Sequence, residues 1–198
     1  MAVDPSEPSA ATPAAGGASA RVWDRLVRLL HWTLVGCVAV AWLSTVERFG
    51  GLYGSHQPAG WIALGAVALR VLWGFGSSRY ARFAQFVRGP RATAAYARAV
   101  LAHCEPRHLG HNPLGAWMVL ALMACVIGLA LTGWLYTTDR YFGDETVETV
   151  HLWLAWTLLA LAGVHVGGVI FTSIRQRENL VAAMFSGEKR APREGDAS

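Results

Sequence analysis

The sequence predicts an all-α fold: an integral membrane four-helix bundle with an amphipathic segment on its cytoplasmic side. Of its 198 residues, 54% are hydrophobic and only 15% are charged, whereas about a quarter of the residues in ordinary soluble domains are charged. Nine tryptophans suit a membrane protein, in which aromatic side chains gather at the lipid–water interface. Four long apolar runs and a one-sided distribution of basic residues complete the prediction.

The apolar runs cover residues 29–46, 58–76, 114–137 and 150–174. Each is near or above the roughly 18–20 residues that cross a bilayer as a helix. Helices are the expected form, because lipid cannot satisfy open backbone groups.

The remaining segments are shorter or less regular. Residues 1–20 are mostly Ala, Pro, Ser and Gly without periodicity, and they predict a disordered tail without the pattern of a cleavable signal peptide. Residues 91–103 carry apolar and basic residues at helical spacing, which predicts an amphipathic helix on the membrane surface, and residues 179–185 are a candidate for another. We therefore expect a four-helix transmembrane domain at 21–187 and a flexible basic tail at 188–198.

Basic residues predict the orientation of the bundle. Fourteen of the 17 Lys and Arg residues flank the apolar runs on one side, whereas only Arg48 and Arg140 lie in the opposite loops and Arg70 lies within a run. The positive-inside rule places both termini in the cytoplasm. Because the formal charge of +4 is sorted by position, it indicates topology and not binding to nucleic acid.

Four histidines lie within or at the mouths of the apolar runs: His31, His56, His151 and His165. Ionisable residues are costly in a bilayer and mark function by default. His151 and His165 are separated by 14 residues, which puts both on one face of a helix, roughly 21 Å apart. The alternating helix directions then place His31 level with His165 at the inner end, and His56 level with His151 at the outer end.

Two depth-matched pairs predict two buried haem groups, because imidazoles from facing helices can bind one haem iron from opposite sides. Taken singly, each histidine could instead be hydrogen-bonded in the core or lie among lipid headgroups, and it is the match of all four that favours ligation. Neighbouring glycines could admit a flat macrocycle or allow close helix packing. They are Gly60, Gly65, Gly163, Gly167 and Gly168.

Arg70 lies 14 residues beyond His56, near the depth of the inner pair. A buried arginine needs an anion, and a haem propionate is the expected one. The alternative is that the side chain snorkels to the cytoplasmic interface. His103, His108 and His111 lie in the inner loop beside basic residues and are expected to be solvated, with a role at a partner or quinone site as the alternative. The three cysteines form no CxxC or CxxCH motif, so nothing predicts a zinc, iron–sulfur or covalent haem site.

Several segments together resemble the bacterial cytochrome b561 family, the group that includes the b-type cytochrome subunits of nickel–iron hydrogenases. They are RLVRLLHW at 25–32, HQPAGW at 56–61, RVLWGF at 70–75, RFAQFVRGP at 82–90, HNPLG at 111–115 and ETVH at 148–151, followed by His165. The resemblance covers residues 21–190 in order. It implies a four-helix membrane cytochrome with two non-covalent b haems, in agreement with the histidine spacing.

These observations predict a di-haem b cytochrome of the bacterial plasma (inner) membrane. It would transfer electrons across the membrane between a quinone/quinol pool and a redox protein, such as a cytochrome c or a hydrogenase-like subunit. Whether it is the quinone-reactive subunit of an oxidoreductase stays open. Two alternatives are a structural membrane anchor for a redox complex and a histidine-lined proton relay or transporter. The anchor needs no matched histidines, and the relay predicts Asp or Glu within the apolar runs, which contain none.

Overall fold

Four long apolar helices form the body of the protein in the computed structural model, which describes residues 19–76, 82–192 and 196. They are α1 (Arg25–Leu43), α2 (His56–Gly76), α5 (Pro113–Tyr136) and α6 (Glu145–Gln176). Each is long and apolar enough to cross a membrane. The predicted helical bundle with four candidate spans is therefore confirmed.

Two of these helices begin before the apolar runs, because acidic residues cap them. The Asp24 carboxylate accepts a hydrogen bond from the Val27 amide at 2.8 Å, so α1 starts at Arg25. The Asp144 carboxylate accepts from the amides of Thr146 and Val147, so α6 starts at Glu145. Hydropathy alone misses these first turns because they contain charged residues, Arg25 and Arg28 in α1 and Glu145 and Glu148 in α6.

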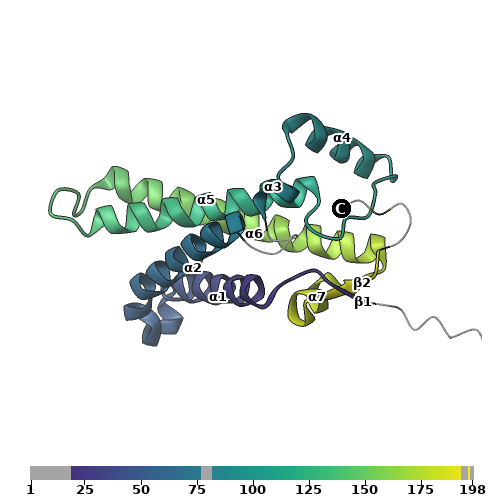
Figure 1. Cartoon of the computed structure of the whole chain (residues 1–198). Coiled ribbons are helices and arrows are strands. Elements are labelled where there is room, and N and C mark those ends of the chain that lie inside the picture. The colour runs from purple at the N-terminus through teal and green to yellow at the C-terminus, as the bar shows by residue number, and fades with distance from the viewer. Residues whose placement is uncertain (1–18, 77–81, 193–195, 197–198) are drawn as a thin grey trace, which may run out of the picture.

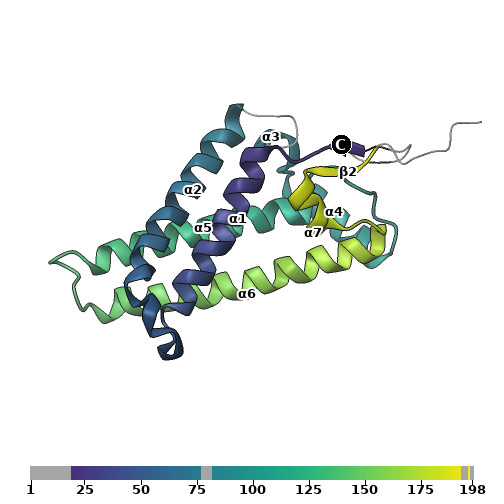
Figure 2. The same ribbon diagram turned by 90° about the horizontal axis from the view of Figure 1, so that it is seen from below.

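The helices pack in the order α1, α2, α5, α6. Figures 1 and 2 show α1 beside α2, and α5 beside α6, with α2 crossing α5. Their shared core comprises Ala63, Val67, Met123, Cys125, Val126 and Leu158. The outside of the bundle carries large apolar side chains such as Leu72 and Trp153, each 70% exposed. Such a surface is typical of helices that contact lipid.

Shorter elements connect the spans. We use "inner" and "outer" for the two ends of the bundle as defined by the predicted orientation. The 3₁₀ helix η1 (Glu47–Ser55) joins α1 to α2 at the outer end, and α3 (Phe83–Phe86) and α4 (Pro90–Leu101) lie between α2 and α5 at the inner end. The helix expected at 91–103 is present as α4, and Trp117 of α5 donates to the hydroxyl of Thr93 in α4 at 3.1 Å.

A small structure that we call the clasp lies at the inner end. It consists of β1 (Ser19–Arg21), α7 (Leu180–Ser186) and β2 (Glu188–Arg190). The two strands pair antiparallel, with Ser19 opposite Arg190 and Arg21 opposite Glu188 (Figure 1). The amide of Val22 donates to the Gly187 carbonyl at 2.9 Å. This structure differs from the flexible tails expected at both ends, while residues 1–18 of the first tail lie outside the described part.

The clasp connects α1 to the end of α6. Arg28 of α1 donates to the carbonyl oxygens of Ser186 and Phe185, and Trp32 stacks on Phe185 with ring centroids 4.3 Å apart. At the other side, the Leu180 amide donates to the hydroxyl of Ser173 in α6 at 3.2 Å. Helix α7, expected as a surface amphipathic segment at 179–185, therefore packs against α1.

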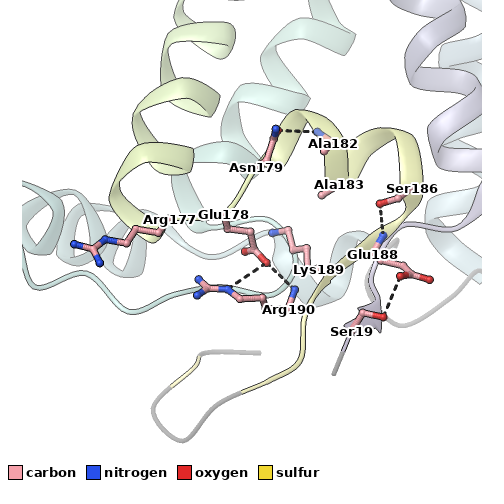
Figure 3. Close-up of a pocket in the computed structure, with 10 residues that line it drawn as sticks. All are labelled: Ser19, Arg177, Glu178, Asn179, Ala182, Ala183, Ser186, Glu188, Lys189 and Arg190. Carbon is pink, nitrogen blue, oxygen red and sulfur yellow. Dashed lines mark hydrogen bonds and ion pairs between the residues drawn. The ribbon is translucent and has the colours of Figure 1, made fainter. Parts of the chain in front are cut away.

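A network of ion pairs and hydrogen bonds connects the clasp to the end of α6 and to the loop before α5. Glu178 follows α6 and accepts hydrogen bonds from the Arg107 side chain at 2.9 Å and from the Arg190 amide at 2.7 Å. Figure 3 shows the Glu178 carboxylate turned toward Arg190 beneath α7. Arg107 also pairs with Asp196. The loop before α5, the end of α6 and the C-terminal segment thus meet at one partly buried arginine, Arg107.

Candidate cofactor-binding site

The structure brings the four predicted histidines together as two pairs. The rings of His31 in α1 and His165 in α6 have centroids 6.4 Å apart and planes tilted by 54°. The rings of His56, at the start of α2, and His151 in α6 have centroids 6.1 Å apart and planes tilted by 56°. We call these the inner pair and the outer pair, and both contain a histidine of α6.

The separation within each pair suits one metal ion between two imidazoles. A metal–nitrogen bond is roughly 2 Å long, so two rings bound on opposite sides of one metal have centroids about 6 Å apart. Among the described residues, no group of three or more His, Cys, Asp or Glu side chains could hold a metal ion. Each pair could therefore supply two ligands, with the others coming from a macrocycle.

Hydrogen bonds orient the outer pair. The Nδ1 atom of His151 lies 2.8 Å from the hydroxyl of Thr132 in α5. The Nδ1 atom of His56 lies 2.9 Å from the carbonyl oxygen of Ala41 in α1. Each ring thus keeps Nε2 available as a metal ligand. The hydrogen-bond partner at Nδ1, Thr132 for His151 and Ala41 for His56, fixes the orientation of the ring, as at many metal sites.

The inner pair has a different environment. The Nδ1 atom of His31 is buried and has no hydrogen-bond partner among the described residues. The edge of its ring contacts Trp32, with ring centroids 5.1 Å apart. A buried polar atom without a partner beside a second imidazole is compatible with a cofactor bound at this pair.

Arg70 is buried at the inner end of α2, with only 6% of its surface exposed. Its guanidinium lies over the ring of Phe83, 5.0 Å from the ring centroid. The phenyl ring of Phe83 also fills the space beside Gly74, where a Cβ atom would lie only 2.2 Å from a ring carbon. The arginine is therefore held by packing inside the protein.

Glycines next to the histidines leave open space. A Cβ atom added at any of them would meet no described residue within 4 Å; they are Gly60, Gly65, Gly163, Gly167 and Gly168. Close helix packing, one of the two explanations considered for these glycines, is thus absent from the described part. The space is compatible with the approach of a flat ligand.

His111 was expected to be solvated, and this prediction is wrong. Its ring contacts Trp23 with centroids 4.8 Å apart, and its Nδ1 atom is buried. Burial, together with the positive charges of Arg70 and Lys189, lowers the pKa of His111 to about 3. Its neighbour Asn112 caps α5, but a cap gives no sign in the sequence that the preceding side chain is buried.

Lys189 was also missed. It is the only lysine of the chain, and only 6% of its surface is exposed. Its Nζ atom lies 5.8 Å from the centroid of the Trp23 ring. Burial lowers the pKa of Lys189 to about 8, although nearby Glu178 opposes the shift. A lysine among arginines in a basic C-terminal segment gives no sequence signal of burial.

Comparison with known proteins identifies the family of the chain. The family model described as prokaryotic cytochrome b561 matches residues 22–187. A curated relative from Bradyrhizobium diazoefficiens, "Probable Ni/Fe-hydrogenase B-type cytochrome subunit", is 24% identical over an alignment that covers 89% of this chain and 88% of the relative. A cytochrome of this type carries haem b, and its membrane helices serve electron transfer. The chain therefore belongs to the prokaryotic cytochrome b561 family.

Proposed function

We propose that the chain binds two haem b groups and transfers electrons across the membrane. The inner haem would lie between His31 and His165, and the outer haem between His56 and His151. The observation that carries the proposal is the presence of two imidazole pairs, each with the ring separation that one metal requires, toward opposite ends of the bundle.

When bound, each haem would supply a centre that gains and loses one electron. The protein's own groups would set the conditions for that exchange. The four imidazoles would hold the haem irons, the helices would exclude water, and Thr132 and Ala41 would orient the outer pair. Arg70 would offset the charge of an inner propionate, because a cation buried at membrane depth is stabilised by an anion.

We propose a quinone/quinol pool as one redox partner and a protein as the other. The relative is a hydrogenase cytochrome subunit by name, which supports a partner of the hydrogenase type, with a cytochrome c as an alternative. The basic residues support cytoplasmic termini in a bacterial inner membrane. In that orientation the two haems would carry electrons between the two faces of the membrane.

Haem stoichiometry tests the proposal directly. Pyridine haemochrome analysis of the purified protein, set against its protein concentration, is expected to give two haems b per chain, all extractable by acidic acetone. A ratio near one, or a haem that resists extraction, would contradict the two-site assignment. Absence of a b-type absorption band on reduction would instead favour a structural anchor or a histidine relay.

A further inference from the structure

Thr132 of α5 is buried and faces His151 of α6. Its hydroxyl lies 2.8 Å from the carbonyl oxygen of Gly128 and 2.8 Å from Nδ1 of His151. A hydroxyl has one proton, and the Gly128 carbonyl can only accept it. The lone pairs of the hydroxyl therefore face the imidazole, and Nδ1 of His151 is the atom that donates.

His56 is oriented in the same sense from another helix. Its Nδ1 atom lies 2.9 Å from the Ala41 carbonyl oxygen, which can only accept, so Nδ1 carries the proton here also. The Ser44 hydroxyl donates to the same carbonyl at 2.7 Å and lies 3.1 Å from the ring nitrogen. Both outer rings consequently present an unprotonated Nε2.

The inner pair lacks this arrangement at His31, whose buried Nδ1 has no hydrogen-bond partner in the described part of the chain. An imidazole that donates through Nδ1 gains electron density and becomes a more basic ligand. A more basic axial ligand stabilises the oxidised iron relative to the reduced iron, which lowers the reduction potential. The two sites should therefore differ in how strongly their ligands donate.

We propose that Thr132 is a positioning residue that holds His151 through Nδ1 and lowers the reduction potential of the outer haem. This inference rests on the proposed function, since it needs a haem between His56 and His151. Gly133, the next residue, supports the role, because a Cβ atom there would lie 3.4 Å from Cε1 of the His151 ring. The two residues together form the surface on which that ring rests.

The test is a redox titration of the purified protein with the substitution Thr132→Val, which keeps the side-chain shape and removes the hydroxyl. The outer step, identified as the one that His56→Leu abolishes, is expected to move to higher potential while the inner step stays in place. Thr132→Ser restores the hydroxyl and is expected to restore the wild-type titration. Should the valine variant bind no outer haem, Thr132→Ala is read instead, because it removes the hydroxyl without adding bulk.

Thr137→Val is the matched control. Thr137 is the C-cap of the same helix, and its hydroxyl donates to the Trp134 carbonyl without contacting a histidine. Equal movement of both steps, movement in this control, or an unmoved outer step would overturn the role of Thr132. These results differ from a wild-type protein with a single haem step, which would instead contradict the proposed function itself.

Discussion

His151 and His165 belong to one helix, and the role of each can be separated by substitution. We expect His151→Leu to remove the outer haem and keep the inner one, because His165, the inner ligand on the same helix, lies about 21 Å further along α6. The haem content should fall from two per chain to one. Trp153→Leu is the control, since Trp153 is an exposed residue two positions further along α6. Loss of both haems in the histidine variant would show that the sites depend on each other.

Arg70 offers a second prediction at the level of one side chain. A buried cation near the inner haem disfavours the extra positive charge of the oxidised iron, so Arg70→Leu is expected to lower the inner reduction potential. The outer step should stay nearly unchanged because it is farther away. Arg140→Leu, in the loop between α5 and α6, is the control. If neither step moves in Arg70→Leu, the arginine has only a packing role on Phe83.

The four histidines and their pairing could be predicted because spacing along two helices fixes depth and face. Other residues of the site could not. Thr132 lies within an apolar run, where a lone threonine carries no sign of its partner on α6. His111 and Lys189 are basic residues near the membrane surface, and their burial depends on how Trp23 and the clasp fold over them. Such tertiary contacts leave no periodic pattern.

At the level of elements, the clasp depends on Glu178 being charged. Burial alone would raise the pKa of Glu178, but hydrogen bonds from the Arg107 side chain and the Arg190 amide lower it below its usual 4.5. A lowered pKa stabilises the fold above pH 4.5, and this stability is lost as the pH falls through the lowered value. Glu178→Gln should therefore cost about 1–3 kcal/mol at neutral pH.

Thermal unfolding of the purified protein at several pH values checks this prediction. The difference in midpoint between wild type and Glu178→Gln is expected to be large at neutral pH and to shrink below pH 4.5. Glu188→Gln is the control, because Glu188 lies in the same clasp but is exposed, and its carboxylate accepts only from the Ser19 hydroxyl among the contacts described. A difference that stays constant with pH would assign the effect to shape and not to charge.

The helices were predictable and the sheet was not, for a physical reason. A span of about 20 apolar residues is a local property of the chain, whereas β1 and β2 have three residues each and lie at opposite ends of the described chain. Their pairing depends on hydrogen bonds between residues far apart in the sequence, which no local sequence pattern can reveal. The early starts of α1 and α6 fall between these cases, since Asp24 and Asp144 are recognisable caps placed outside the hydropathy runs.

Orientation is a property of the whole molecule, and it stays a prediction until it is measured. Fourteen basic residues on one side place both termini in the cytoplasm. A reporter fused to the C-terminus should be active only if it is of a type that functions in the cytoplasm. A reporter inserted near Asp139, between α5 and α6, should be active only if it is of a type that functions in the periplasm. Activity of a C-terminal reporter only in the periplasm would reverse the inner and outer ends.

Chemical labelling of the buried Lys189 can report whether the clasp is closed. Its ε-amine is the only one in the chain, and with a pKa of about 8 much of it is in the nucleophilic, uncharged form at pH 8. Reaction with an amine-reactive ester is therefore limited by access and not by protonation. Peptide mapping should find Lys189 unmodified in the intact protein and modified after denaturation. Modification of Lys189 in folded Arg28→Ala, but not in Arg91→Ala, would then report opening of the clasp alone.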